Sequence, residues 1–126
     1  MRGLGRGVLS LTIATWLAAG IASANELTPA QAATRVGEAA SVCGVVSDAS
    51  FRPNLRGEPT FLSFGGAYPD HAFNALVWGG HRAKFLPPPE SYEGEVLCVS
   101  GRSASYRGKP QIVVDMPRQF SAPEPR

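Results

Sequence analysis

Residues 95–106 read E-V-L-C-V-S-G-R-S-A-S-Y, and this segment predicts one long β-strand with a kink at Gly101. The Arg107-Gly108 pair that follows predicts a tight turn, and residues 111–115 predict the next strand. Long strands that bend at a glycine allow a small sheet to close on itself. The segment therefore favours a small curled barrel.

Further strands are expected upstream of this segment, at residues 41–47, 60–64 and 73–78. Gly44, inside the first of them, suggests a bulge or a sharp coiling of that strand. Residues 48–59 form a polar loop, and residues 81–85 form one helical turn at most, because three prolines follow at 87–89. The expected fold class is all-β, a five-stranded barrel with a short N-terminal helix.

The short helix is predicted from its start and stop signals. Thr28 can cap the first turn, Pro29 suits the first helical position, and Gln31 completes a capping box. Gly37 supplies the stop. The apolar stripe expected on this helix consists of Ala30, Ala33 and Val36.

Residues 1–24 have the pattern of a secretory signal peptide. Arg2 and Arg6 precede an apolar stretch at residues 8–21, and residues 22–24 form an A-x-A cleavage site. The alternative is an uncleaved membrane anchor, but a spanning helix needs about 20 apolar residues and this stretch is shorter. We therefore expect export to the periplasm or to the extracellular medium.

Cleavage changes the charge of the protein. The whole chain has 12 Lys and Arg against 10 Asp and Glu, a net charge of +2, and losing Arg2 and Arg6 brings the balance to zero. A neutral protein does not hold nucleic acid by bulk electrostatics, so any such binding needs a local patch. The expected organisation is a single domain at residues 25–118, followed by a Pro-rich disordered tail at residues 119–126.

The only two cysteines are Cys43 and Cys98. Two cysteines cannot build a four-cysteine zinc site, and in an exported protein a disulfide is the default state. The alternative is a redox-active or catalytic thiol, but the chain has no C-x-x-C pair to support redox exchange.

The order of these elements over residues 27–117 resembles the OB-fold. The resemblance rests on V-C-G-V-V at 42–46, T-F-L-S-F at 60–64, F-N-A-L-V-W at 73–78, E-G-E-V-L-C-V-S-G at 93–101 and S-Y-R-G-K-P-Q-I-V-V at 105–114. The last two segments look like the fourth and fifth strands of nucleic-acid-binding OB domains, including the anticodon-binding type, and of small exported bacterial OB proteins. The resemblance implies that the first and fourth strands pair, which would bring Cys43 and Cys98 together.

The resemblance also implies a binding face on the second and third strands, flanked by two loops. The residues that would bind there are Phe51, Arg52, Asn54 and Arg56 in the first loop, Tyr106, Arg107 and Lys109 in the second, and Arg102 nearby. Strand alternation adds Phe61, Asn74 and Trp78 on the outer face and places Leu62, Phe64, Phe73, Ala75 and Val77 in the core. Arginines beside aromatic rings suit single-stranded nucleic acid. The alternative is that both loops are merely solvated, and that Tyr106 and Trp78 pack at the barrel rim.

Catalytic and metal-binding patterns are weak in this sequence. His71 and His81 lie ten residues apart, which is not a recognised metal spacing, and the acidic cluster of Glu90, Glu93 and Glu95 is expected to be a solvated loop. We therefore expect a non-enzymatic binding module without metal or cofactor. Its expected partner is single-stranded nucleic acid. The alternatives are an envelope adaptor for proteins or small ligands, and a divergent hydrolase.

Overall fold

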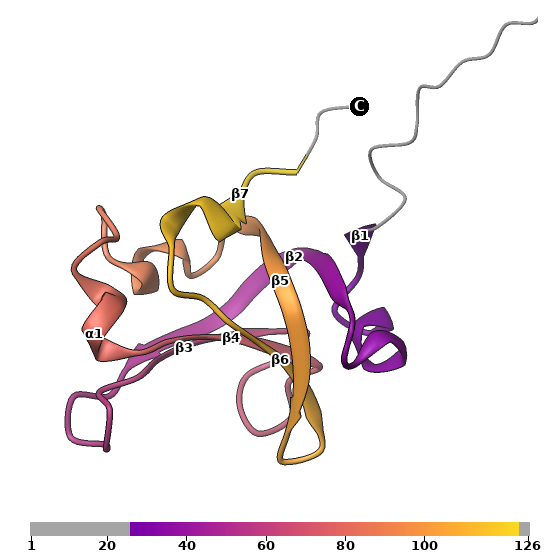
Figure 1. Cartoon of the computed structure of the whole chain (residues 1–126), viewed down its shortest axis with the longest axis horizontal. Coiled ribbons are helices and arrows are strands. Elements are labelled where there is room, and N and C mark those ends of the chain that lie inside the picture. Colours follow the sequence, from indigo (N-terminus) through magenta and orange to yellow (C-terminus); the bar gives the residue numbers. More distant parts are fainter. Residues whose placement is uncertain (1–25, 124–126) are drawn as a thin grey trace, which may run out of the picture.

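The computed structural model describes residues 26–123 and shows a closed barrel of five strands (Figure 1). The barrel strands are β2 (Ala39–Phe51), β3 (Thr60–Phe64), β4 (Phe73–Val77), β5 (Val96–Tyr106) and β6 (Lys109–Val113). They follow the order β2-β3-β4-β6-β5, and pairing of β2 with β5 closes the barrel. β4 and β6 run parallel, and the other barrel pairs are antiparallel. The predicted all-β, five-stranded barrel is confirmed, and its strand order is compatible with an OB barrel.

The remaining elements are short and lie around the barrel. They are β1 (Glu26–Leu27), η2 (Gln31–Arg35), α1 (Gly79–Arg82), η3 (Pro89–Tyr92), η4 (Pro117–Gln119) and β7 (Phe120–Ser121). β1 pairs with β2, and β7 pairs with β5. No helix within residues 26–123 has the length and apolar character needed to cross a membrane.

The predicted N-terminal helix exists, as a 3-10 helix of five residues, η2. Its capping box is formed, because the Gln31 N–H donates to Thr28 Oγ1 at 3.1 Å and the Thr28 N–H donates to Gln31 Oε1 at 2.9 Å. The predicted apolar stripe is wrong: Ala32 is the buried residue of η2, whereas Ala30, Ala33 and Val36 are exposed. The stripe assumes the α-helical repeat of about 3.6 residues per turn, whereas a 3-10 helix has about 3.0 residues per turn and directs different side chains to the core.

The core is filled from the inner faces of the barrel strands. The five predicted core residues, Leu62, Phe64, Phe73, Ala75 and Val77, are all fully buried. Phe64 and Phe73 face each other across β3 and β4 with ring centroids 5.3 Å apart. Strand alternation therefore identifies the core face of β3 and β4 correctly, although the outer face of β4 is buried as well.

The disulfide Cys43–Cys98 is present. The two residues lie directly opposite each other in the pairing of β2 with β5, with their Cα atoms 4.0 Å apart. The bridge therefore crosses the strand pair that closes the barrel, as the predicted pairing of the first and fourth strands implied.

The first barrel strand is longer than predicted, and its bulge lies at a different position. β2 continues through residues 48–51, which had been expected in the loop. Its register with β3 shifts between Val46 and Asp48 rather than at Gly44. Gly44 instead lets the N-terminal segment approach, since a Cβ there would lie 2.8 Å from Pro29 Cγ. The last barrel strand, β6, begins earlier than predicted, at Lys109.

The chain stays ordered beyond the predicted domain end at residue 118. Phe120 of β7 pairs with Val99 of β5 and is only 8% exposed. Its ring packs against the rings of Phe85 and Tyr92, with centroid distances of 5.4 and 5.3 Å respectively. The prediction that the disordered tail begins at residue 119 is therefore wrong for Phe120, because one large aromatic ring here completes the core. The predicted signal peptide at residues 1–24 and the last residues, 124–126, lie outside the described part of the chain.

Candidate functional site

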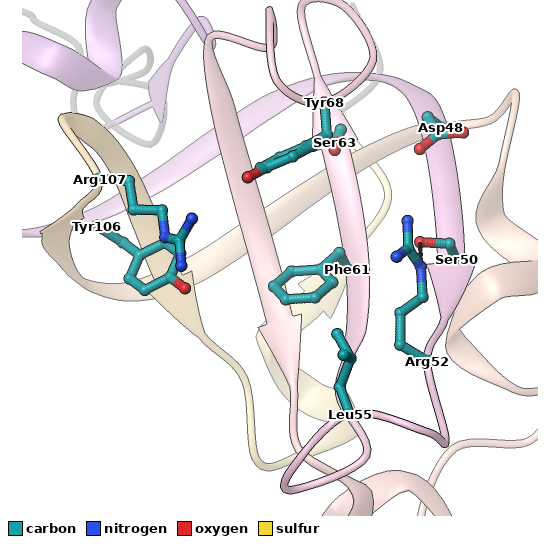
Figure 2. Close-up of a pocket in the computed structure, with 9 residues that line it drawn as sticks. All are labelled: Asp48, Ser50, Arg52, Leu55, Phe61, Ser63, Tyr68, Tyr106 and Arg107. Atoms are coloured by element: carbon teal, nitrogen blue, oxygen red, sulfur yellow. Dashed lines mark hydrogen bonds between the residues drawn. The ribbon is translucent and has the colours of Figure 1, made fainter.

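A groove of about 230 Å³ lies on the outer face of the barrel (Figure 2). Its floor comes from β2 and β3, and its walls come from the loops after β2, β3 and β5. The lining residues are Asp48, Ser50, Arg52, Leu55, Phe61, Ser63, Tyr68, Tyr106 and Arg107. The groove therefore combines three aromatic rings, two guanidinium groups and one carboxylate.

The structure brings four of the predicted site residues together in this groove, namely Arg52, Phe61, Tyr106 and Arg107. Phe61 lies at the centre, with Arg52 on one side and the Tyr106–Arg107 turn on the other (Figure 2). The two arginines come from segments far apart in the sequence, and the barrel places them on opposite sides of one ring.

Sequence reasoning missed the other five lining residues, Asp48, Ser50, Leu55, Ser63 and Tyr68. Ser63 shares its strand face with Phe61, so alternation alone could have found it. Asp48 faces the groove because of the bulge: Val46 pairs with Phe64 in the core, and Asp48 pairs with outward-facing Ser63. Without the extra residue, alternation would turn Asp48 inward.

Both groove arginines are held by neighbouring side chains. Arg52 Nε donates to Ser50 Oγ at 3.2 Å. The Arg107 guanidinium lies 5.4 Å from the centre of the Tyr106 ring, and hydrogen bonding to the Tyr106 hydroxyl raises the pKa of Arg107 above its usual value. Both side chains therefore present positive charges at the groove walls.

Beside the groove, Tyr68 stacks on His71 with ring centroids 5.4 Å apart. His71 is 5% exposed, and its burial, aided by the charge of Lys109, lowers the pKa of the imidazole below its usual value. Lys109 Nζ donates to the His71 carbonyl at 2.7 Å. Lys109 therefore holds the loop that carries Tyr68, and this contact uses one of the three donors of its ammonium group.

Two predicted outer-face residues are not available in the groove. Asn74 lies on the predicted face but is 3% exposed, because it is central in the sheet between Ser63 of β3 and Gln111 of β6. Trp78 is 40% exposed, but its ring packs closely over Gly57. A Cβ atom added at Gly57 would lie only 2.7 Å from the ring, so a larger residue there would clash with it. Gly57, at φ +81°, is thus the position at which the loop makes room for this ring.

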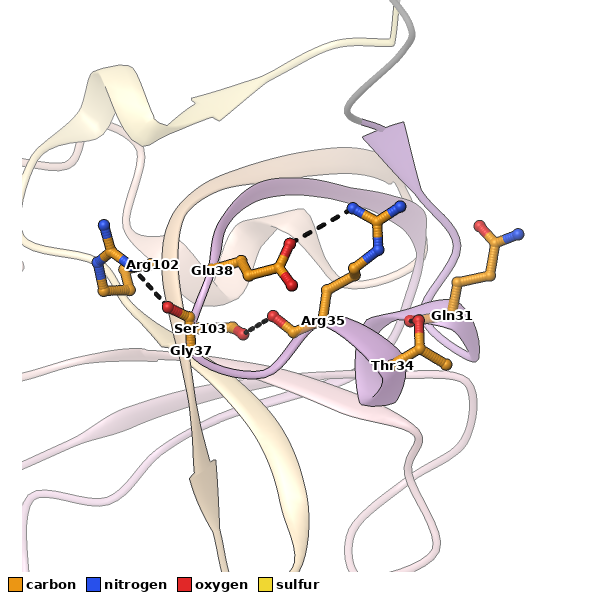
Figure 3. A network of polar contacts seen from close by, with 7 residues as sticks. All are labelled: Gln31, Thr34, Arg35, Gly37, Glu38, Arg102 and Ser103. Atoms are coloured by element: carbon orange, nitrogen blue, oxygen red, sulfur yellow. Dashed lines mark hydrogen bonds and ion pairs between the residues drawn. The ribbon is translucent and has the colours of Figure 1, made fainter.

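The remaining predicted binding residues lie elsewhere. Arg102 donates to the carbonyl of Gly37 at 2.6 Å, near the contact in which the Ser103 hydroxyl donates to the Arg35 carbonyl (Figure 3). Phe51 lies under the guanidinium of Arg82, 3.7 Å from the ring centroid. The exposed loop residues Asn54 and Arg56 do not line the groove. The candidate binding surface is therefore smaller than the sequence suggested.

An ion pair that sequence reasoning missed lies at the end of the barrel. Arg82 donates to both carboxylate oxygens of Glu90, with Nη1 at 2.6 Å from Oε1, and Nη1 also donates to Thr60 Oγ1 at 2.9 Å. Glu90 was expected in a solvated acidic loop, but hydrogen bonding to Arg82 lowers the pKa of its carboxyl group. The pair joins α1 and η3 to the start of β3, so its role is structural.

The histidines and the acidic cluster do not converge on a catalytic site. His81 Nδ1 lies 3.0 Å from Lys84 Nζ, His71 stacks on Tyr68, and Glu93 accepts a hydrogen bond from the Ala49 N–H at 2.9 Å. In residues 26–123, the one group with metal-ligand geometry is Glu26 with Cys43 and Cys98. Metals bind cysteine as the thiolate, whereas these two sulfur atoms are bonded to each other in the disulfide. The group therefore does not offer the sulfur ligands that a metal ion would need.

Comparison with known proteins adds no relative. The chain matches no protein family, no curated protein and no solved structure.

Proposed function

We propose that this protein is an exported, non-enzymatic OB-type binding module that holds single-stranded nucleic acid in the groove between Arg52 and Arg107. The observation that carries the proposal is the pair of guanidinium groups on either side of the Phe61 ring. A disulfide across the barrel is consistent with an oxidising compartment such as the periplasm or the extracellular medium.

The chemistry of the groove fits an unpaired strand better than a duplex. Bases stack on aromatic rings, and each stacked base contributes about 1–3 kcal/mol. Phe61, Tyr68 and Tyr106 provide such rings within one groove, whereas stacking of this kind requires bases that are not already stacked in a helix. Arg52 and Arg107 would bind the phosphates on either side of the base that stacks on Phe61.

Replacing Arg52 and Arg107 by alanine together should lower the affinity for a short single-stranded DNA about 30-fold at low salt, because each arginine supplies one charge-assisted contact. Two phosphate contacts to a single strand predict that the logarithm of the affinity falls against the logarithm of the salt concentration with a slope of about −1.4. The affinity of the double variant should no longer depend on salt in this way. Fluorescence anisotropy over a salt series measures both quantities. The double variant Arg35→Ala and Arg118→Ala removes equal charge outside the groove and serves as the control. No binding at low salt, or binding that ignores salt, would refute the proposal.

The second candidate is an envelope adaptor that binds a protein or a small ligand through the same groove. The neutral charge balance expected after removal of residues 1–24 and the carboxylate of Asp48 in the groove favour it. Capture of partners from an envelope extract, with and without nuclease treatment, separates the two candidates. Capture that survives nuclease and requires Phe61 would favour the adaptor, and capture that nuclease abolishes would favour nucleic acid.

A further inference from the structure

The groove contains an acidic side chain that phosphate binding does not explain. Asp48 faces the same space as Arg52 and Arg107. In the described part of the chain the ion pairs are Arg35–Glu38 and Arg82–Glu90, so no salt bridge neutralises the Asp48 carboxylate. A negative charge among phosphate-binding arginines weakens attraction to the backbone of any strand. Such a charge favours a ligand that presents hydrogen-bond donors to it.

The side chain next to Asp48 also has an unused polar atom. Ser63 is directly opposite Asp48 in the pairing of β2 with β3, so their side chains are neighbours on the outer face. Ser63 is 1% exposed and lines the groove, and its Oγ has no hydrogen-bond partner within residues 26–123. Buried hydroxyl groups normally have a partner, so a ligand seated against Ser63 would supply the hydrogen bond that this hydroxyl lacks.

From this pair we infer that the groove selects guanine among the bases of a bound single strand. The inference rests on the proposed function. The Watson–Crick edge of guanine presents two adjacent N–H donors followed by a carbonyl oxygen. The two oxygens of the Asp48 carboxylate match the donors, and the Ser63 hydroxyl can donate to the carbonyl. The edge of thymine has one N–H between two carbonyl oxygens, which would face the carboxylate with like partial charge.

The bulge in β2 is the backbone feature that creates this pair. The register shift between Val46 and Asp48 places Asp48 beside Ser63 on the groove side of the sheet. Bulges often occur next to functional sites, where they re-aim one side chain. Phe61, two residues before Ser63 on the same face of β3, is in position to hold the plane of the base while its edge reaches this pair.

The test compares a short oligothymidine strand with the same strand carrying one central guanine or one central hypoxanthine. The wild-type protein should bind the guanine strand about 10-fold more tightly than oligothymidine. The hypoxanthine strand should bind with intermediate affinity, because hypoxanthine lacks the second N–H donor. Fluorescence anisotropy at one fixed salt concentration measures all three affinities.

The Asp48→Asn variant should lose the guanine preference and bind oligothymidine at least as tightly as the wild type, because a repulsive charge is gone. Ser63→Ala should reduce the preference for the guanine strand over oligothymidine, because the donor to the guanine carbonyl is gone. Asp115→Asn, which removes the same charge from an exposed position outside the groove, should leave the preference intact. Equal wild-type affinity for the guanine and thymine strands would overturn the inference and leave the proposed function standing. Failure to bind any strand would overturn both.

Discussion

Removal of the disulfide by the double substitution Cys43→Ala and Cys98→Ala is expected to lower the free energy of unfolding by about 4 kcal/mol. The bridge closes a loop between residues 55 positions apart in sequence, and in the chain-entropy account a loop of this length restricts the unfolded chain strongly. The expected loss is a large part of the stability of a domain of this size. Denaturant unfolding of the oxidised wild type and the variant measures it.

The control for this prediction lies in the same pair of strands. Ser41 and Ser100 are opposite each other in β2 and β5, and the Ser100 hydroxyl donates to Ser41 Oγ at 3.3 Å. The double variant Ser41→Ala and Ser100→Ala removes a cross-strand contact without a covalent link, and it should cost about 1 kcal/mol. Reduced wild-type protein should behave like the cysteine variant. If oxidised and reduced protein unfold at the same denaturant concentration, the bridge does not stabilise the barrel.

Arg82→Ala is the second substitution for which we expect a large effect, a loss of about 3 kcal/mol in the free energy of unfolding. The variant removes two hydrogen bonds to Glu90 and one to Thr60, and it uncovers the ring of Phe51. The side chains of Arg82 and Glu90 are only 21% and 32% exposed, so the remaining carboxylate would be left without its partner in a partly buried site. Thermal and denaturant unfolding measure the loss.

The effect of Arg82→Ala should depend on pH in a defined direction. Arg82 lowers the pKa of Glu90 below its usual 4.5, so the folded protein binds that proton less readily than the unfolded chain. The stabilisation is therefore complete above pH 4.5 and is lost as the pH falls through the folded-state pKa. The stability difference between wild type and variant should shrink below that pH.

Two further variants separate this ion pair from ordinary surface charge. Arg35→Ala breaks the exposed pair Arg35–Glu38, whose side chains are 49% and 57% exposed, and it should cost less than about 0.5 kcal/mol at any pH. Arg82→Lys keeps the charge but not the two-pronged hydrogen bonding, so it should restore part of the lost stability. Equal stability losses in Arg82→Ala and Arg35→Ala would contradict the structural role of Arg82.

The features that could be predicted from the sequence are those fixed by neighbouring residues. Alternation along residues 60–64 and 73–77 identified the core face, because successive side chains of a strand point to opposite faces of the sheet. Arg107 and Gly108, with φ of 52° and 82°, form the tight turn expected from their types. The barrel followed from several such local signals that agree with one another.

The features that could not be predicted depend on contacts between distant segments. The bulge that turns Asp48 outward is set by the pairing of β2 with β3, and nothing in the local residue types marks it. Tyr68 lines the groove because its loop folds over β3 and is held by Lys109 of β6. Four of the predicted site residues line the groove. Local patterns alone could not have grouped them, and the prediction took their arrangement from the resemblance to the OB-fold.

The way in which this barrel closes also has a consequence for the rate at which the protein folds. The hairpin of β5 and β6 joins segments close in sequence, whereas β2 with β5 and β4 with β6 join distant ones. Distant pairings incur the entropy of loop closure before they contribute contacts, so proteins dominated by them fold in milliseconds to seconds. A newly synthesised chain will therefore spend an appreciable time with unpaired strands, during which protection from aggregation matters most.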